Sequence, residues 1–259
     1  MVELRADSDG VMVLIDGIES SHLDLEDPSH LVFEYMQQMM AVLQLAHTTT
    51  QRLQVLHLGG AGCALARAID AHWPQPRQLV FEIDALLAQY VRQWFTLPRS
   101  PRLRIRVGDA RTELDSLTPQ RFDVVVRDAF QGREVPDHLR TQEFTHAVQR
   151  ALTPTGIYLA NLADSPPLRL ARREAATISA VFDHVIAIAE PGVLRGRRYG
   201  NVVLAASQAP VQHADLSRAL RSLPVPAALV SEQALPDFIA GERPLRDPSP
   251  DNETGPHYR

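Results

Sequence analysis

The sequence contains no lysine, and all 26 of its basic residues are arginines. A Schiff-base mechanism and a phosphate-binding loop ending in Gly-Lys are therefore excluded, because both need a lysine amine. The single cysteine, Cys63, excludes an internal disulfide bond and argues against a cysteine-based zinc site. Neither HExxH nor GxSxG occurs, so the commonest signatures of metalloproteases and serine hydrolases are missing. We expect no bound metal.

Long hydrophobic runs are also missing. No stretch approaches the roughly 18 apolar residues of a membrane span, and the first ten residues, MVELRADSDG, are charged where a signal peptide is apolar. We therefore expect a cytoplasmic protein with no membrane partner. The net charge of −5 provides no basic footprint, so no nucleic-acid partner is expected either. A length of 259 residues fits one domain with short appendages.

The N-terminal part of the sequence predicts a small β ribbon over residues 1–28. Its apolar alternation is typical of strands, and Asp16-Gly17 is typical of a hairpin turn. The methionine-rich stretch that follows, residues 29–46, has the apolar spacing of a helix, with Ser29 as a candidate N-cap. We expect this apolar face to belong to the core.

Strand-like and helix-like segments then alternate along the chain. Strands are expected at residues 52–60, 77–84, 103–110, 121–130, 156–164, 184–190 and 200–207, with helices between most of them and near 215–223. This alternation predicts an α/β domain of the Rossmann-like type over residues 29–235, with a mostly parallel twisted sheet flanked by helices. Residues 236–259 are rich in proline and charge and are expected to form a flexible tail.

In an open parallel sheet, ligands bind beyond the carboxyl ends of the strands, and four features fall at such ends. Gly59, Gly60 and Gly62 follow the first strand and allow either close approach to a ligand or simply a tight turn. Glu82 lies 20 residues after Gly62, the distance at which nucleoside-binding units place an acid on ribose hydroxyls. A solvated carboxylate at the strand end is the alternative interpretation.

The other two features are aspartates. Asp109, followed by the small Ala110, suits either an adenine amino group or a helix N-cap. Asp128 ends a run of three valines that predicts a buried strand, so its carboxylate needs a cation or several donors. An amine substrate or a sulfonium donor would supply that charge. The alternative interpretation of Asp128 is a structural role, as a helix cap or in an ion pair with a neighbouring arginine. His57, inside the first strand, is expected to be a satisfied core histidine rather than a catalyst.

Together these motifs resemble a known family. The order Gly-Gly-x-Gly, V-x-E-I-D, G-D-A and a strand-four Asp is similar to that of spermidine and spermine synthases. The segment RDAFQGREVPDHLRTQEF, residues 127–144, resembles the spermidine synthase-like branch in particular, and the resemblance extends over about residues 11–207. It implies a class I transferase fold and a donor that is S-adenosylmethionine or its decarboxylated form. It also implies that the N-terminal ribbon is a dimerisation element, so a homodimer is expected.

The resemblance further implies roles for individual residues. The donor site would comprise Gly59, Gly60, Gly62, Glu82, Asp84, Asp109 and Ala110. Asp128 would bind and deprotonate a small-molecule amine acceptor. Tyr35, Gln37 and Gln131 would line the acceptor site.

Two positions depart from the family pattern. Gly62 stands where typical members have the Asp that holds the aminopropyl ammonium of the donor, and Gln131 stands where they have a second acid. A charge-assisted hydrogen bond contributes about 1.5–3 kcal/mol, so losing two would cost several powers of ten in diamine selectivity. The alternatives are therefore an S-adenosylmethionine-dependent methyltransferase or a non-catalytic nucleoside-binding protein. A nicotinamide dehydrogenase is disfavoured because little chain follows the sheet.

Overall fold

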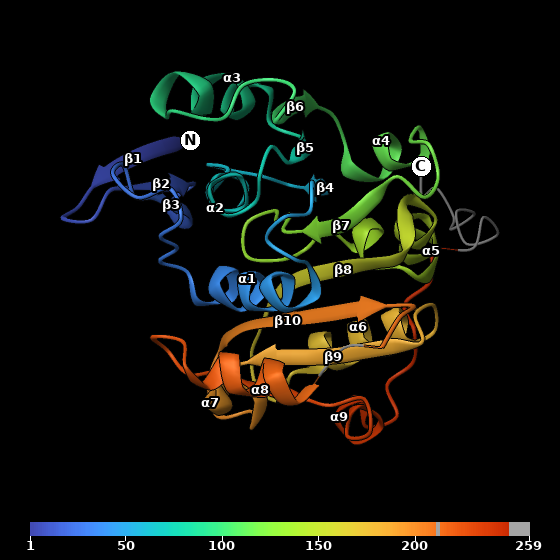
Figure 1. Cartoon of the computed structure of the whole chain (residues 1–259). Coiled ribbons are helices and arrows are strands. Elements are labelled where there is room, and N and C mark those ends of the chain that lie inside the picture. The colour runs from blue at the N-terminus through green and yellow to red at the C-terminus, as the bar shows by residue number, and fades with distance from the viewer. Residues whose placement is uncertain (211–212, 249–259) are drawn as a thin grey trace, which may run out of the picture.

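Two sheets form the framework of the protein. The computed structural model describes residues 1–210 and 213–248. A three-stranded antiparallel ribbon stands beside an eight-stranded sheet that has helices on both faces (Figure 1).

The ribbon confirms the predicted hairpin and adds one strand to it. Its strands are β1 (Val2–Ala6), β2 (Val11–Ile15) and β3 (Ile18–Leu23). Asp16 and Gly17, between β2 and β3, both have positive φ, at 49° and 77°. A two-residue turn of this kind matches the right-handed twist of the strands that it joins.

The large sheet has the strand order β11-β9-β10-β8-β7-β4-β5-β6. Its members are β4 (Gln54–Leu58), β5 (Arg77–Glu82), β6 (Leu103–Val107), β7 (Phe122–Arg127), β8 (Leu152–Asp164), β9 (His184–Ala189), β10 (Gly200–Ser207) and β11 (Ala228–Val230). Strands β4 to β8 pair in parallel, whereas β10 and β11 pair antiparallel to their neighbours. The chain moves from β4 to β5 and β6 on one side and then to β7 on the other, so the switch point lies between β4 and β7.

The helices follow the predicted alternation. They are α1 (Glu34–Ala46), α2 (Ala64–His72), α3 (Ala85–Trp94), α4 (Ala110–Asp115), the 3₁₀ turn η1 (Asp137–Leu139), α5 (Gln142–Ala151), α6 (Arg169–Ser179), α7 (Pro191–Leu194), α8 (His213–Arg221) and α9 (Leu235–Ile239). Over residues 1–210 and 213–248, none of them is long and apolar enough to cross a membrane.

Two hydrophobic cores lie on opposite faces of the sheet because successive strand side chains point to opposite sides. Val55 belongs to the core shared with α1, α2, α3 and α8, and the next residue, Leu56, belongs to the core shared with α4, α5, α6 and α9. Figure 1 shows α1 and α8 in front of the sheet and α6 behind it. The methionine-rich face of α1 is buried, as predicted, with Met39 fully inaccessible.

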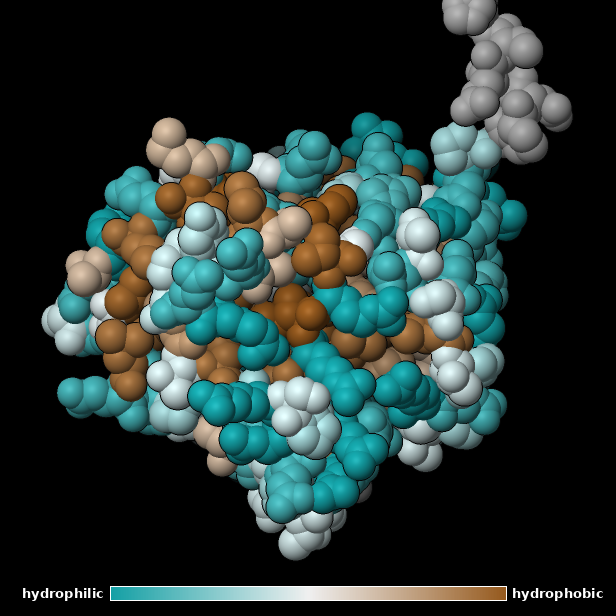
Figure 2. Space-filling view, turned by 90° about the horizontal axis from the view of Figure 1, so that it is seen from above, coloured by the Kyte–Doolittle hydropathy of each residue, from teal (hydrophilic) through white to brown (hydrophobic). Residues whose placement is uncertain are grey.

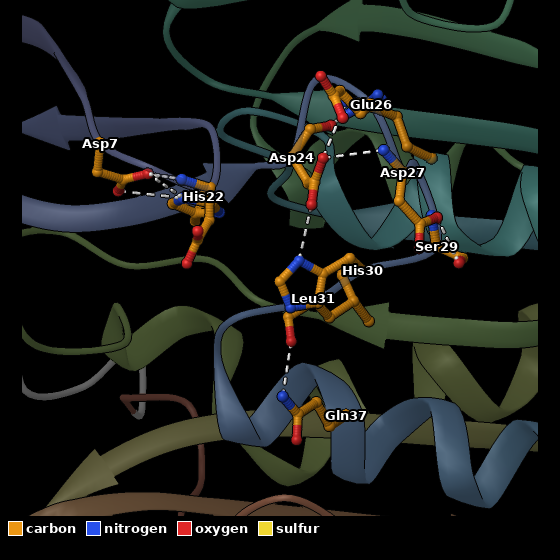
Figure 3. Close-up of polar contacts among 11 residues, drawn as sticks. Asp7, His22, Asp24, Glu26, Asp27, Ser29, His30, Leu31 and Gln37 are labelled. Carbon is orange, nitrogen blue, oxygen red and sulfur yellow. Dashed lines mark hydrogen bonds and ion pairs between the residues drawn. The ribbon is translucent and has the colours of Figure 1, made fainter.

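The start of α1 differs from the prediction. Its N-cap residue is Phe33, and Ser29 instead donates its hydroxyl to Asp27 at 2.6 Å. The connection from the ribbon is held by Asp24, which accepts from His30 Nδ1 at 2.8 Å (Figure 3). The polar side chains of this connection therefore form hydrogen bonds with one another. The helix begins at Glu34, four residues after the start that an N-cap at Ser29 would give.

The C-terminal part also differs from the prediction as far as residue 248. Helix α9 crosses the expected boundary at 235, and Phe238 is buried in the core. Leu245 donates its N–H to Thr177 Oγ1 at 2.8 Å, and Asp247 forms an ion pair with Arg111. Residues 236–248 are held against the domain by contacts with distant elements. Amino-acid composition, on which the prediction of a flexible tail was based, does not reveal such contacts. The remainder of the predicted tail, residues 249–259, lies outside the described residues.

Candidate active site

The glycine-rich loop lies at the switch point. It connects β4 to α2, and Gly59 has a φ of +86°. A Cβ atom at Gly59 would lie 2.4 Å from the backbone oxygen of Asp128, closer than real side chains approach. The N–H of Asp128 donates to the oxygen of Leu58 at 2.9 Å. Glycine at position 59 therefore allows the ends of β4 and β7 to meet.

Glu82, at the end of β5, holds this loop in place. Its Oε2 accepts from the N–H groups of Gly60 at 3.3 Å and Ala61 at 3.1 Å, and its Oε1 accepts from the N–H of Asp84 at 3.0 Å. The side chain is buried rather than solvated. Because two carboxylate oxygens offer about four acceptor sites, Glu82 retains capacity for hydroxyl donors after making these bonds.

Asp84 and Asp109 both cap helices. Asp84 Oδ1 accepts from the N–H of Leu86 at 2.9 Å at the start of α3. Asp109 Oδ1 accepts from the N–H of Thr112 at 3.0 Å at the start of α4, and Asp109 Oδ2 lies 2.9 Å from His138 Nε2. Burial acts to raise the pKa of Asp109, but the bonds from Thr112 and His138 outweigh it and the pKa is lowered. Ala110 is buried as the first residue of α4.

Exposed apolar side chains lie next to these acids. Ile83 is 70% exposed between Glu82 and Asp84, and Val107 is 52% exposed at the end of β6. The view from above shows hydrophobic surface gathered on the face that carries the ribbon and α3 (Figure 2). Sequence reasoning did not single out these two residues, although an apolar residue directly after a strand-end acid is a usable signal.

Asp128 is the centre of a polar network. Tyr35 donates its hydroxyl to Asp128 Oδ2 at 2.9 Å, and Asn161 donates its amide to Oδ1 at 2.8 Å. Asn201, on β10, donates in turn to Asn161 Oδ1 at 3.0 Å. Burial raises the pKa of Asp128 above its usual value, although the bonds from Asn161 and Tyr35 and the charge of Arg127 oppose this. Sequence reasoning missed both asparagines. The only signal for each is an amide in an apolar strand, YLANLA for Asn161 and GNVVLAAS for Asn201.

Buried ion pairs support the backbone beneath Asp128. Arg127 and Glu174 are fully buried and pair directly, and Arg140 Nε lies 3.2 Å from Glu174 Oε2. Arg127 also donates to the backbone oxygen of Asn161 at 2.8 Å. The network therefore fixes the end of β7, α6 and the segment before α5 relative to one another.

Two predicted acceptor residues do not reach Asp128. The amide of Gln37 donates to the oxygen of Leu31 at 2.6 Å, at the entry to α1 (Figure 3). Gln131 is exposed, and its backbone forms a bridge with Glu134. Of the three predicted acceptor residues, the structure brings only Tyr35 to Asp128.

Gly62 lies against the ribbon. Its N–H donates to Ser21 Oγ at 2.9 Å. A Cβ atom there would lie 2.6 Å from Leu23 Cδ1 and 2.8 Å from Ser21 Cβ. Strand β3 therefore occupies the space that an aspartate at position 62 would need, which gives a physical reason for this departure from the family pattern.

A small cavity of about 20 Å³ adjoins Gly59 and Asp128, with room for about one water molecule. His57 lines it with its Nε2 2.9 Å from Gln78 Oε1, and burial lowers the pKa of His57 to about 4. Burial also raises the pKa of Cys63 to about 12. Both groups are therefore neutral at pH 7, which confirms His57 as a satisfied core histidine. Among the described residues that line the cavity, Asp128 alone has a carboxylate.

The switch-point glycine loop and the strand-end acids are arranged on this sheet as in the class I methyltransferase-like fold. Human methyltransferase-like protein 13, solved in complex with SAH, shares this fold, with a TM-score of 0.59 and 22% identity. The alignment covers 84% of this chain and 96% of that one. No protein-family model matches the sequence.

Two further relatives establish the family. A probable spermidine synthase from Corynebacterium glutamicum superimposes with a TM-score of 0.90 and 39% identity, covering 96% of this chain and 93% of that one. The polyamine aminopropyltransferase of Vibrio vulnificus is 29% identical over 61% of this chain and 53% of its own length. The chain spans about half the length of the curated aminopropyltransferases that it matches. The chain belongs to the spermidine synthase-like family.

Proposed function

We propose that this protein transfers an alkyl group from an S-adenosyl-sulfonium donor to an amine acceptor, with Asp128 binding and deprotonating the amine. The observation that carries the proposal is the network at the switch point. Tyr35 and Asn161 each donate to one oxygen of Asp128, which leaves the carboxylate oriented beside the glycine loop. A fixed carboxylate at the place where a nucleoside-sulfonium donor would bind is suited to an amine nucleophile.

The chemistry is a displacement at carbon. The amine nitrogen forms a bond to the carbon attached to the sulfonium sulfur, the C–S bond breaks, and a neutral thioether leaves. Because aliphatic amines have a pKa near 10.4, judging by lysine, the acceptor arrives mostly protonated. Asp128 would hold the ammonium and take one of its protons, which frees the nitrogen lone pair that forms the C–N bond. The remaining task of the site is to align the nucleophile with the S–C bond.

The donor would occupy the edge formed by the glycine loop, β5 and β6. Glu82 has acceptor capacity left for ribose hydroxyls, and the exposed side chains of Ile83 and Val107 offer apolar surface to a purine ring. Asp109, 31% exposed at its side chain, lies on the same edge within reach of an exocyclic amine. The SAH-bound relative with the same fold supports a donor of the S-adenosylmethionine type.

Methyl transfer is the second candidate, and the packing of Gly62 favours it. The donor's aminopropyl ammonium would have no carboxylate at position 62, because Leu23 and Ser21 fill the space of a side chain there. Ordinary S-adenosylmethionine with Asp128 at the acceptor would give a methylated amine and S-adenosylhomocysteine.

Product identification tests both candidates. The protein is incubated with S-adenosylmethionine or its decarboxylated form and a panel of mono- and diamines, and products are identified by mass spectrometry. Aminopropylated or methylated amine, accompanied by methylthioadenosine or S-adenosylhomocysteine respectively, supports the proposal and selects the donor. Donor binding without any product in the panel, measured by calorimetry, favours a non-catalytic nucleoside-binding protein.

A further inference from the structure

A second concave site lies at the edge of the sheet opposite the candidate active site. The segments that precede β4, β5 and β6 enclose a pocket of about 400 Å³ lined by Arg52, Arg77, Arg99 and Arg102. These strands are parallel neighbours, so their N-terminal ends meet at one edge and bring together arginines up to 50 positions apart. The volume lies within the roughly 300–1,000 Å³ range of small-molecule sites.

Backbone hydrogen bonds fix the walls of this pocket. The N–H of Arg77 donates to the oxygen of Leu53 at 2.8 Å, and the N–H of Gln78 donates to the oxygen of Arg102 at 2.8 Å. Arg102 also donates its N–H to the oxygen of Arg99 at 2.9 Å. The three segments are therefore tied to one another where the strands begin, and the backbone of Arg77, Arg99 and Arg102 is held by these bonds.

The pocket carries more positive charge than its neighbours neutralise. Arg102 pairs with Asp70 at 2.9 Å, and Arg52 donates to the neutral amide of Gln75. Within residues 1–210 and 213–248, Arg77 and Arg99 form no ion pair, and no carboxylate lines the pocket. Arginine stays protonated at every physiological pH, so four guanidinium groups repel one another in a concavity that concentrates their field. A bound anion would relieve that repulsion.

We infer that this pocket binds a short oligophosphate such as pyrophosphate or tripolyphosphate. Guanidinium groups match phosphate oxygens with two parallel hydrogen bonds, and several of them together favour a ligand with several negative charges. The described lining has no aromatic ring on which a nucleobase could stack, so the phosphate chain itself is the recognised group. A long nucleic acid is disfavoured because the chain as a whole has a net charge of −5. This inference does not depend on the proposed transferase activity.

Calorimetric titration of the full chain with tripolyphosphate tests the inference. Wild-type protein is expected to bind one equivalent, and Arg77→Gln with Arg99→Gln to bind about 100-fold more weakly, about tenfold for each lost charge-assisted contact. The matched control is Arg150→Gln with Arg218→Gln, which removes two exposed arginines on α5 and α8. Its affinity should stay within about twofold of wild type.

Three results would overturn the inference. They are no saturable binding by the folded wild-type protein, an equal loss in the control variant, or tighter binding of a single-stranded oligonucleotide than of tripolyphosphate. Thermal melting of each variant distinguishes a lost site from a lost fold. Because donor binding is titrated separately with methylthioadenosine, failure here leaves the proposed transferase function unaffected.

Discussion

The hydroxyl of Tyr35 donates a 2.9 Å hydrogen bond to Asp128 Oδ2, although 93 positions separate the two residues. Burial and the adjacent charge of Asp128 raise the pKa of Tyr35 well above its usual value, so the phenol stays protonated and acts as a donor. The first turn of α1 therefore orients the carboxylate at the end of β7. This relationship gives Asp128 a fixed direction and is the basis of the first prediction.

Replacing Asp128 with asparagine is expected to lower turnover by roughly 10²–10⁴, the usual contribution of a general base. The wild-type rate should fall as pH decreases through the raised pKa of Asp128, because protonation removes the base. The asparagine variant lacks this titration, and its deficit should shrink at high pH, where more amine is already neutral. A pH–rate profile with donor affinity and thermal melting checks this. Near-wild-type turnover in a folded variant across the pH range would end the base assignment.

Replacing Glu82 with glutamine is expected to weaken methylthioadenosine binding by about 1.5–3 kcal/mol, the scale of a charge-assisted hydrogen bond. The structure adds a second reason, since Glu82 also holds the N–H groups of Gly60 and Ala61. Calorimetry measures the affinity, and Glu3→Gln on the exposed strand β1 serves as the control. Unchanged affinity in folded Glu82→Gln protein would remove Glu82 from the donor site.

Restoring the family's two acids is expected to have unequal costs. Gly62→Asp should destabilise the fold by about 1–3 kcal/mol, because its side chain would displace Leu23 and Ser21. Gln131→Asp, at an exposed position, should change stability by no more than about 0.5 kcal/mol. Denaturant unfolding of both variants measures the difference. Equal stability of the two variants would show that the ribbon residues packed against position 62 move aside at little cost.

The buried imidazole of His57 makes stability depend on pH. Its pKa is about 4 in the folded protein and near 6.5 when unfolded, so its contribution is complete above pH 6.5 and is lost as pH falls toward 4. The difference of about 2.5 pKa units corresponds to about 3 kcal/mol. His57→Gln should therefore lose less unfolding free energy than wild type between pH 7 and 4. Parallel acid titrations of the two proteins would contradict this.

Breaking the buried ion pairs is expected to cost far more than breaking one at the surface. Glu174→Gln leaves Arg127 buried without a charged partner and should lower stability by about 3–5 kcal/mol. The control, Asp115→Asn, removes the exposed partner of Arg150 and should cost no more than about 1 kcal/mol. Chemical unfolding compares them. A cost below 1 kcal/mol for Glu174→Gln would mean that water reaches Arg127.

Local patterns were sufficient to predict most elements of the sheet. Strand-like runs ending in Gly59, Glu82, Asp109 and Asp128 gave the strand-end positions, because hydrophobic periodicity and turn residues act over a few positions. The N-cap of α1 was wrongly predicted at Ser29. Which polar residue caps a helix depends on the partners that each one finds in the folded chain. Asp24 and Asp27 satisfy that segment before the helix begins.

The sequence by itself determined the α/β alternation, the hairpin at Asp16-Gly17 and the placement of Asp128 at a strand end. Only the tertiary structure decided what meets Asp128. Tyr35 arrives from α1 and Asn161 from β8, while Gln37 and Gln131 lie elsewhere. Periodicity assigns a residue to a face of its own element, whereas contacts between distant elements depend on how the sheet orders its strands and how helices pack across it.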